Sequence, residues 1–438
     1  MFFKSENNGR VLTVILIGAG LRGMGYTDIM KENPGKFKVI AVAEPDEGRR
    51  NKLKKTHNIS DDMCFSSWTD ILSKPKMADI ALICTTDNMH YEVAMKAIEL
   101  GYDIVLEKPV APTAEQCRDI AFAAKERNVK VLVCHVLRYT SFFKKIKTLI
   151  MQGTIGEVMS VIHVEAVGNV HQSHSYVRGN WHCEKESTPM LLAKCCHDID
   201  ILQWLIDKPC KRVQSFGELT YFRKENAPEG APIRCIDGGC PIEDTCPYNC
   251  KNLYYHSKDN VWFRPACASG IAQSHVPTDE EVMTALKTTD YGLCVFHANN
   301  DVVDHQVVNM EFEGGKTVSL TMNAFNEGGR YIRIFGTKGE LYANMSDRKI
   351  SVYTFEDKKR RKVSIKGRRI SGGHGGGDQG MIKEMYDYFN GNYNGFCAAD
   401  IDISVKNHLI GFAAEKARKS GTVESIDEFF SEYGMIND

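Results

Sequence analysis

Short apolar runs alternate with amphipathic segments along residues 14–135. Each run is rich in Val, Ile and Leu and has the length of a buried strand, and each following segment carries its apolar residues at helical spacing. Strict alternation of strand and helix predicts parallel strands joined by right-handed crossovers, which is a doubly wound sheet. The predicted strands are 14–17, 38–43, 78–84, 102–106 and 130–135, and the clearest helices between them are 91–100 and 114–127.

Beyond about residue 140 the apolar positions alternate with a period of two, and glycine turns separate the alternating runs. This pattern is typical of a largely antiparallel sheet with one face free for packing or for a partner subunit. The basic run 358–362 is predicted to be a solvated hairpin or strand edge. The predicted strands are 158–167, 213–221, 302–312, 317–324, 331–335 and 340–343, and the predicted helices are 142–152, 190–206, 380–389 and 401–419.

Together the two patterns predict an α/β protein of two domains. Residues 1–139 are predicted to form an N-terminal doubly wound parallel sheet of the Rossmann type, a fold that is expected to bind a dinucleotide. Residues 140–438 are predicted to form a C-terminal α+β domain with a large open, mostly antiparallel sheet, one face of which is free for packing or for a partner subunit. A Cys-rich insertion near 223–290 interrupts this second domain.

A glycine-rich turn follows the first predicted strand. Gly18, Gly20 and Gly23 have the G-x-G-x-x-G spacing of a phosphate-binding loop that opens into a helix. Glycine permits the tight turn and the close approach of a pyrophosphate, and the helix N-terminus adds a positive dipole end. Leu21 and Arg22 complete the loop as cofactor-binding candidates. By itself the same spacing also fits a plain turn.

The second predicted strand ends at Glu44, about twenty residues beyond the loop. An acid at this place in a dinucleotide fold binds the hydroxyls of the adenosine ribose and repels a 2′-phosphate, so NAD is favoured over NADP. Arg49 and Arg50 follow closely and would soften that preference. The alternative is a solvated acid at the end of a strand.

Polar residues also follow the later predicted strands. Ligands of doubly wound sheets bind beyond the carboxyl ends of the strands, so these residues are expected to lie near one site. The cofactor-binding candidates among them are Thr85, Thr86, Asn88, His90, Glu107, Lys108 and Arg138.

The overall composition and charge limit which partners and which cellular location are expected. The chain has 438 residues and a net charge of −1, with acidic and basic residues interspersed, so neither nucleic acid nor a membrane surface is an expected partner. Its start lacks the apolar core of a signal peptide. Fifteen cysteines without an export signal favour thiols or metal ligands over disulfides, and the expected location is cytoplasmic.

Four of these cysteines are concentrated in one short segment with the spacing C-x4-C-x5-C-x3-C. The density of cysteines between Gly and Pro turns suits a tetrahedral thiolate site, in which Zn²⁺ would staple a long insertion that lacks a core. Free thiols are the alternative, while an iron–sulfur cluster or a cytoplasmic disulfide fits less well. The candidate metal ligands are Cys235, Cys240, Cys246 and Cys250.

Several motifs along nearly the whole chain resemble the Gfo/Idh/MocA family of NAD(P)-dependent oxidoreductases. The resemblance implies a Rossmann domain followed by an α/β domain whose open sheet often mediates oligomerisation, here as a dimer or tetramer. It also implies action on a carbon of a sugar, inositol or related polyol. The motifs are 17–23, 41–46, 85–90, Glu107-Lys108-Pro109, 155–158, 196–200 and 335–340.

The resemblance assigns two catalytic residues. Lys108 looks like the lysine that polarises the reacting oxygen, and His197 looks like the general acid/base. Without the resemblance, Lys108 reads as a surface lysine before a turn proline and His197 as a satisfied core histidine. Family dehydrogenases commonly carry an acid four residues before this histidine, where this chain has Ala193. Lys194 is expected to face the site instead, to hold substrate hydroxyls or to lower the pKa of His197.

A loop at 172–181 mixes polar and aromatic side chains in a way that suits a sugar. Packing between the domains is the equal alternative for this loop. The glycine-rich segment 371–378 is a further candidate to close over the same site. The candidate substrate-binding residues are His174, Tyr176, Arg178, Trp181 and His374.

The leading hypothesis is therefore an NAD-dependent oxidoreductase of a sugar or polyol, with Lys108 and His197 at the reacting carbon. The absence of an acid at position 193 leaves room for a glycoside hydrolase or lyase that uses tightly bound NAD catalytically through a keto-sugar intermediate. It also leaves room for a non-catalytic sensor of NAD or sugar.

Overall fold

The computed structural model describes residues 9–272, 276–365 and 373–436 of the chain. Contacts divide the chain into two compact units. The first contains Met1–Lys144 and Gly367–Lys406, and the second contains Lys145–Lys366 and Asn407–Asp438. The sequence pattern assigned 140–438 to one domain, whereas the contacts assign 367–406 to the unit that contains the N-terminal half.

The first unit is built on a six-stranded sheet in the order β3-β2-β1-β4-β5-β6, and every neighbouring pair is parallel. This order has its reversal point between β1 and β4, where doubly wound sheets bind dinucleotides. The predicted doubly wound sheet is confirmed. Its strands are β1 Leu12–Ile17, β2 Phe37–Ala43, β3 Cys64–Phe65, β4 Ile80–Ile83, β5 Asp103–Leu106 and β6 Val131–Val133.

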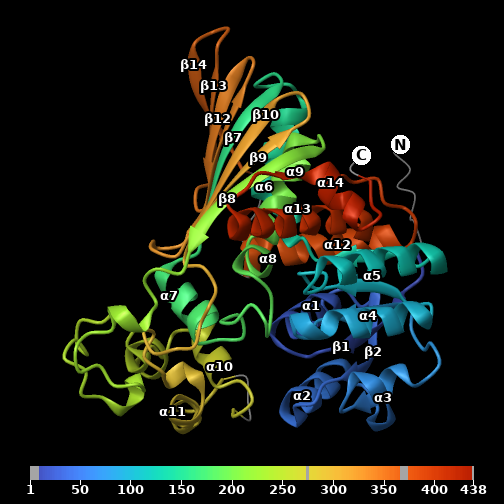
Figure 1. Ribbon diagram of the computed structural model, residues 1–438. Helices are drawn as coiled ribbons and strands as arrows, with labels where there is room; N and C mark the ends of the chain where they lie inside the picture. The colour runs from blue at the N-terminus through green and yellow to red at the C-terminus, as the bar shows by residue number, and fades with distance from the viewer. Residues whose placement is uncertain (1–8, 273–275, 366–372, 437–438) are drawn as a thin grey trace. The chain divides into compact units, whose positions relative to one another are not determined.

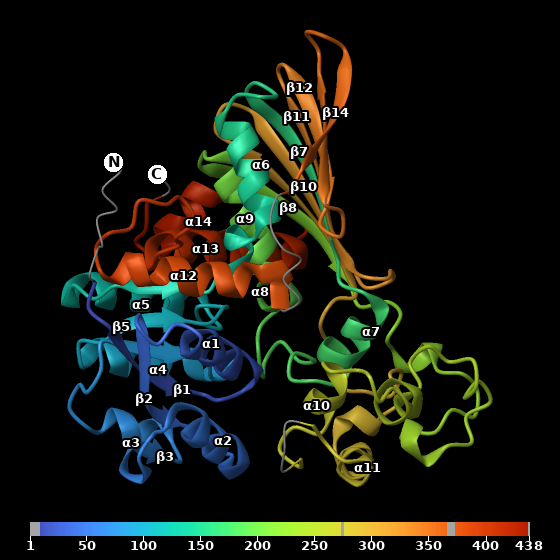
Figure 2. The same ribbon diagram turned by 180° about the vertical axis from the view of Figure 1, so that it is seen from behind.

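Helices cover this sheet on its faces, as Figures 1 and 2 show from opposite sides. The sheet is buried because apolar residues occupy both faces of its central strands, which is usual for parallel sheets. Helix α12 comes from late in the chain and packs against α1 and against the short helix η3 at Val136–Tyr139. The helices are α1 Leu21–Lys31, α2 Glu47–His57, α3 Trp68–Leu72, α4 His90–Glu99, α5 Ala114–Arg127 and α12 Gly377–Phe389.

The second unit is built on a nine-stranded sheet in the order β14-β13-β12-β11-β7-β10-β9-β8-β15. Only β7 and β10 pair in parallel among these neighbours, so the predicted mostly antiparallel sheet is confirmed. The basic run forms the edge strand β14, as expected. The strands are β7 Val158–Ala166, β8 Cys210–Glu218, β9 His305–Phe312, β10 Lys316–Asn323, β11 Gly329–Gly336, β12 Gly339–Asn344, β13 Lys349–Thr354, β14 Lys359–Ser364 and β15 Glu424–Ser425.

The two faces of this sheet differ in character. Helices α6 Ser141–Met151, α9 Cys196–Ile206 and α14 Ile426–Glu432 lie on one side of it (Figures 1 and 2). On the other face no described helix covers the strands, and Ile162 and Tyr342 are exposed there in register with Arg333. The period of two in the sequence reflects this difference between a packed and an open face.

The helix predicted for 190–206 is wrong in one respect, because the structure interrupts it. Helix α8 ends at Ala193 and α9 begins at Cys196, with Cys195 outside helical geometry between them. The argument that position 193 lies one helical turn before His197 therefore does not apply here. Lys194 lies at this break, where its backbone N–H donates to the Met190 carbonyl and ends α8. Helix α13 is Ile401–Ser420 and matches the prediction.

The segment between β8 and β9 has its own hydrophobic cores, contrary to the expectation of an insertion without one. One cluster includes Tyr254, Cys267 and Leu286, and another includes Phe222 and Phe296. Two short helices, α10 Phe263–Cys267 and α11 Asp279–Thr288, lie within it. All fifteen cysteines of the chain fall among the described residues, and none of them is in a disulfide.

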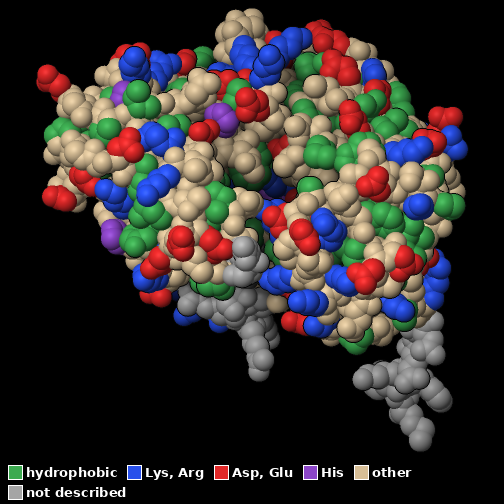
Figure 3. All heavy atoms as spheres, turned by 90° about the horizontal axis from the view of Figure 1, so that it is seen from below, with side chains coloured by type: hydrophobic (Ala, Val, Ile, Leu, Met, Phe, Trp, Pro, Cys, Tyr) green, Lys and Arg blue, Asp and Glu red, His purple; other side chains and the backbone are tan. Residues whose placement is uncertain are grey.

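Charged side chains of both signs are interspersed over the face drawn in Figure 3, in keeping with the near-zero net charge. None of the helices in the described part of the chain combines the length and the apolar character needed to cross a bilayer.

Candidate active site

The glycine loop lies between β1 and α1 and has two different kinds of glycine. Gly18 has φ +94°, and a Cβ there would lie 2.5 Å from the carbonyl oxygen of Cys84. A Cβ on Gly23 would lie 2.2 Å from the carbonyl oxygen of Gly18. These two glycines are therefore required by the fold, whereas a Cβ on Gly20 would meet nothing within 4 Å.

Gly20 caps α1 in an extended conformation that any residue adopts, and no side chain caps this helix end. The amide groups of the first turn have no acceptors within the helix, so they are available to an anion. The open space beside Gly20 is thus a cradle that a side chain would fill. Leu21, the first residue of α1, is exposed beside it.

We expect Gly20→Ala to weaken NAD binding by about tenfold or more, because the added methyl would occupy the space that a pyrophosphate needs. The free energy of unfolding of this variant should differ from that of the wild type by no more than about 0.5 kcal/mol. The matched control is Gly23→Ala, which should cost about 1–3 kcal/mol by overpacking against Gly18. Urea unfolding and titration with NADH fluorescence measure both, and equal NAD affinity of Gly20→Ala and wild type would contradict the assignment.

Glu44 lies immediately after β2 and is buried. Its Oε2 accepts a hydrogen bond from the backbone N–H of Ala19 at 2.7 Å, and its Oε1 accepts one from Asp46 at 3.0 Å. Arg49 contributes a guanidinium 3.8 Å away. The acid is therefore held against the glycine loop, which disfavours the alternative of a solvated strand-end carboxylate.

The turn after β4 presents polar groups at the neighbouring strand end. Thr85 Oγ1 is buried without a hydrogen bond among the described residues, and the Thr86 hydroxyl donates to Asn88 Oδ1 at 2.7 Å. His90 is already engaged, since its Nδ1 lies 2.7 Å from the Pro109 carbonyl oxygen and its Nε2 lies 3.1 Å from that of Thr85. His90 thus ties two strand ends together.

Glu107 and Arg22 form the centre of a partly buried ionic network in the first unit. Arg22 Nε donates to Glu107 Oε1 at 2.8 Å, and its terminal nitrogens donate to both carboxylate oxygens of Asp378 at 2.9 and 2.8 Å. The Tyr26 hydroxyl also donates to Glu107 at 2.7 Å. Burial alone would raise the pKa of Glu107, but Arg22 and Lys108 hold it below its usual value.

Lys108 is the second residue after the end of β5 and is half-buried. Its backbone N–H donates to Glu107 Oε2 at 2.9 Å, so the ionic network also orients the residue that carries the amine. The peptide bond from Lys108 to Pro109 is cis. Arg138 lies buried on η3, at the end of the strand next to β5.

The first unit therefore fits a dinucleotide on its own geometry. It offers an open glycine cradle at a helix N-terminus, a buried acid against that cradle, and an unpartnered threonine hydroxyl at the adjoining strand end. The donors suit phosphates, and the acid suits ribose hydroxyls.

A second cluster of candidate residues lies in the second unit, around the break between α8 and α9. His197 is buried in the first turn of α9. Lys194 Nζ lies 3.4 Å from Glu165 Oε1 and 3.4 Å from His171 Nδ1. Strand β7 thus brings a carboxylate beside Lys194, at the break that precedes His197.

Glu165 belongs to a buried network that continues through Arg330. Arg330 Nε lies 2.6 Å from Glu165 Oε2 and 2.8 Å from Asp198 Oδ1, and His163 Nε2 lies 2.7 Å from the same Asp198 oxygen. Burial raises the pKa of Glu165, against the opposing charges of Arg330 and Lys194. Arg330 and His163 thus hold the carboxylates of this network in place.

Sequence reasoning missed Glu165, Arg330 and His171. One signal could have found Glu165, because it lies at an inward position of β7, where the alternation calls for an apolar residue. No local pattern in the sequence marks Arg330, because its role comes from pairing with a strand that is distant in the chain.

The residues predicted to bind substrate fall into different surroundings. His174 is buried among aromatic rings, with its Nδ1 3.0 Å from the Tyr254 hydroxyl and its ring stacked on Tyr291, and burial lowers its pKa to about 3. Tyr176 is also buried, and its ring centroid lies 6.0 Å from that of Trp181. His374 belongs to the first unit, where its Nδ1 lies 3.4 Å from Asp378 Oδ1.

Arg178 is buried beneath the Cys-rich segment. Its Nε donates to the Leu293 carbonyl at 2.8 Å, and its Nη2 donates to the Tyr248 carbonyl at 2.9 Å. The guanidinium is thus used in the packing of this segment.

The predicted zinc site is not supported. Among the described residues no group of three or more His, Cys, Asp or Glu side chains is arranged to hold a metal ion. Cys250 lies in a hydrophobic cluster, while Cys235, Cys240 and Cys246 line a pocket that also contains Arg178. The insertion also has hydrophobic cores of its own, so the expectation that a metal ion staples a segment without a core does not hold.

Comparison with known proteins identifies both halves of the chain. Residues 12–135 match an oxidoreductase family with an NAD-binding Rossmann fold, and residues 147–403 match the C-terminal alpha/beta domain of the same family. A solved oxidoreductase from Agrobacterium radiobacter in complex with NAD+, L-tartaric acid and magnesium has a similar fold. It is 11% identical with a TM-score of 0.66, and the match covers 95% of this chain and 98% of that one.

Several curated relatives are similar in sequence. The putative oxidoreductase YteT of Bacillus subtilis is 25% identical over 82% of this chain and 81% of its own. An inositol 2-dehydrogenase/D-chiro-inositol 3-dehydrogenase of Lactiplantibacillus plantarum is 24% identical over 50% of this chain and 59% of its own. A 2,7-anhydro-N-acetylneuraminate hydratase of Escherichia coli is 26% identical over 46% of this chain and 53% of its own. With both domain matches in place, the chain belongs to the Gfo/Idh/MocA family of oxidoreductases.

Proposed function

We propose that the protein is an NAD-dependent oxidoreductase that transfers hydride between a C–OH carbon of a sugar, inositol or related polyol and the nicotinamide ring. The observation that carries the proposal is the first unit's site. There a buried acid and an open glycine cradle lie at one edge of the sheet that also ends in Lys108. Inositol oxidation by one relative supports the substrate class.

Bound NAD would supply the hydride acceptor. Lys108 would hold the reacting oxygen, because its ammonium stabilises negative charge that develops on an alkoxide. The Glu107–Arg22 network would keep the backbone of Lys108 in place through the Glu107 hydrogen bond. His197 would take or return the hydroxyl proton, which suits an imidazole.

Lys194 would act beside His197 on substrate hydroxyls. Its ammonium is balanced by Glu165, which lies 3.4 Å away, and the carboxylate is in turn fixed by Arg330. This pair would bring a carboxylate to the break between α8 and α9, just before His197.

The direct test is a panel of sugars, inositols and other polyols with NAD, followed by NADH absorbance and product analysis. We expect NADH to accumulate in step with oxidised product for at least one polyol. If no member of the panel is oxidised, and no corresponding ketone is reduced by NADH, the proposal is wrong.

One relative favours a second candidate, in which NAD is reduced and reoxidised within each turnover. The E. coli relative is named a hydratase, which is not a net redox activity. In that case a glycoside or anhydro-sugar would be converted by hydrolysis or elimination through a keto intermediate. Product formation without net NADH distinguishes it from the first proposal.

We expect Glu44→Ala to change cofactor preference. Removing the carboxylate deletes the group that binds ribose hydroxyls and repels a 2′-phosphate, while Arg49 stays nearby. The Kd for NAD should rise about tenfold or more, and the ratio of NADP to NAD affinity should increase. Fluorescence titration with NADH and NADPH measures both. Glu47→Ala, three residues further along in α2, is the control and should leave both constants unchanged.

The open face of the nine-stranded sheet is proposed to join copies of the chain into a dimer or tetramer. Phe216 and Tyr331 lie in one row across this face, and Ile162 and Tyr342 lie in the next. All four are exposed, which is unusual for large apolar side chains that remain in water. Light scattering after size exclusion should give a molar mass that is a multiple of the 49.2 kDa mass of one chain. The substitution Ile162→Lys should reduce this molar mass.

A further inference from the structure

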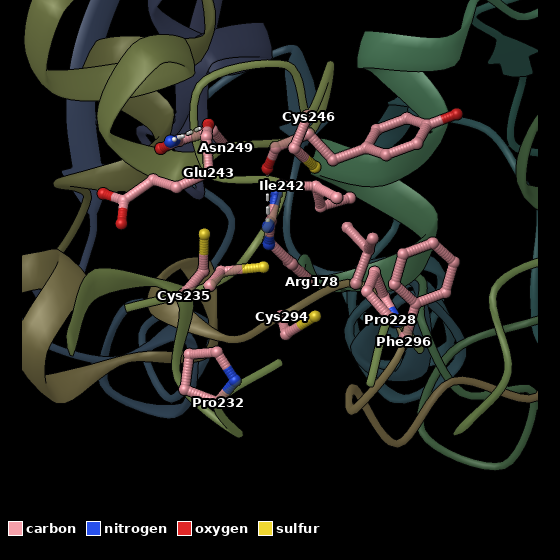
Figure 4. Close-up of a pocket in the computed structure, with 13 residues that line it drawn as sticks. Arg178, Pro228, Pro232, Cys235, Ile242, Glu243, Cys246, Asn249, Cys294 and Phe296 are labelled. Carbon is pink, nitrogen blue, oxygen red and sulfur yellow. Dashed lines mark hydrogen bonds between the residues drawn. The ribbon is translucent and has the colours of Figure 1, made fainter. Parts of the chain in front are cut away.

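The Cys-rich segment contains a pocket in which thiols surround a cation. Four cysteines line the pocket, together with Arg178, Tyr248 and Phe296. Three of them come from the stretch between β8 and α10, and Cys294 comes from beyond α11. The four are Cys235, Cys240, Cys246 and Cys294. Figure 4 shows Cys235, Cys246 and Cys294 together with Arg178 among the side chains that line this pocket.

Cys235 differs from the other three because it contacts a fifth cysteine. The backbone N–H of Cys250 donates to Cys235 Sγ over 3.5 Å, and the Cys250 thiol donates to the same sulfur. Cys250 is fully buried, whereas Cys235 is partly exposed at the pocket. The two sulfurs are therefore neighbours, with one accessible from the pocket and one behind it.

Charge in the pocket favours a thiolate at Cys235. The Arg178 guanidinium is buried beside these thiols, and two of its nitrogens are held by backbone carbonyls, so it cannot turn away without losing both bonds. Hydrogen bonds from Cys250 and the charge of Arg178 lower the pKa of Cys235 to about 6. Burial instead raises the pKa of Cys246 and of Cys294.

We propose that Cys235 and Cys250 are a peroxide-oxidisable dithiol, in which Cys235 attacks the oxidant and Cys250 resolves the product into a disulfide. The inference goes beyond the proposed dehydrogenase activity and does not depend on it. It assigns a modification site to a segment that the proposed hydride transfer does not use.

The chemistry balances with hydrogen peroxide as the oxidant. The Cys235 thiolate attacks one peroxide oxygen, so an S–O bond forms, the O–O bond breaks and hydroxide leaves to become water. Cys235 is then a sulfenic acid. The Cys250 sulfur attacks Cys235 Sγ, the S–S bond forms, the S–O bond breaks, and the departing hydroxide takes the Cys250 proton. Two thiols and one peroxide become one disulfide and two waters.

The first experiment uses the unmodified full-length protein. Reduced protein is alkylated with iodoacetamide at pH 7 for increasing times, and each cysteine is followed by mass spectrometry. We expect Cys235 to react about tenfold faster than Cys246 or Cys294, because its thiolate fraction is larger. Equal rates for the three would overturn the proposal.

The second experiment maps the disulfide after one equivalent of hydrogen peroxide. Cleavage after Arg234 and Lys251 releases one peptide that contains Cys235, Cys240, Cys246 and Cys250, and a further cut after Glu243 separates Cys235 from Cys250. We expect the fragments 235–243 and 244–251 to remain joined. Because Cys240 and Cys246 also lie in them, the double variant Cys240→Ser/Cys246→Ser should form the same link.

Single variants separate the two roles. Cys250→Ser should leave a sulfenic acid on Cys235 that dimedone traps, and Cys235→Ser should abolish the link. Cys294→Ser is the matched control from the same pocket and should form the link like the wild type. A disulfide from Cys240, Cys246 or Cys294 in the wild type would overturn the proposal. So would a stoichiometric metal ion in the purified protein that must be removed before these thiols react.

Discussion

Lys108→Ala is expected to lower kcat by about 10³-fold while the Kd for NAD stays within a few-fold of wild type. The lysine follows β5 at the strand end where the proposed ligand binds, and removing one group that stabilises a developing oxyanion typically costs about 10²–10³ in rate. Its loss should leave the glycine cradle and Glu44 in place, because those groups are held by other contacts. Steady-state kinetics on the substrate found in the panel measures the effect.

The control for this variant is Lys125→Ala, an exposed lysine near the end of α5 in the same unit. It should change neither kcat nor NAD affinity. Full activity of Lys108→Ala would show that the amine does not act on the reacting oxygen, and the proposed chemistry would then be wrong. A loss of NAD affinity with unchanged kcat would assign Lys108 to cofactor binding instead.

Arg330→Met is expected to destabilise the protein by about 3–5 kcal/mol, the usual cost of leaving a buried charge without its partner. The guanidinium stands between Glu165 and Asp198, whose side chains are 2% and 0% exposed. Methionine fills a similar length but supplies no charge, so both carboxylates would lose their nearest cation. Urea-induced unfolding measures the change in free energy.

Arg333→Met is the matched control, since it lies three residues further along β11 and pairs with Glu340. Its side chain is 49% exposed, and pairs in that setting contribute about 0–1 kcal/mol. Similar losses for the two variants would mean that the Arg330 network does not carry the stability assigned to it.

The pH dependence of stability gives a second readout for the same network. Burial alone would raise the pKa of Asp198, but Arg330 and His163 hold it well below its usual value. A carboxyl with a lowered folded-state pKa contributes stability that is fully present above the unfolded-state pKa of about 4 and is lost as pH falls below it. The free energy of unfolding should therefore fall less steeply below about pH 4 in Arg330→Met than in the wild type.

Local features of the sequence were enough to predict most of the first unit. The bounds predicted for α5 agree with the structure at Ala114 and Arg127, because Thr113 caps its start and Asn128 ends it in a left-handed conformation. The glycine loop and Glu44 were found in the same way, since both depend on a fixed spacing after a strand. These parts of the site are encoded by neighbours in the chain.

The remaining parts of the site were set by tertiary contacts. Glu165 and Arg330 are cross-strand partners in the register of β7 and β11, so their pairing exists only once the sheet has formed. Arg22 meets Asp378 from a segment 356 residues away. In the Cys-rich segment, spacing suggested that Cys250 joins a metal site, whereas packing buried it in a hydrophobic cluster and brought Cys294 to the pocket.

The sequence by itself thus determined the class of fold and the glycine loop between β1 and α1, because strand–helix periodicity and short motifs act over a few turns of chain. Only the tertiary structure decided which acid stands beside Lys194, where the helix before His197 breaks, and which thiols face Arg178. Those choices depend on sheet register and on the balance of buried charge, and both couple residues that are far apart in the chain.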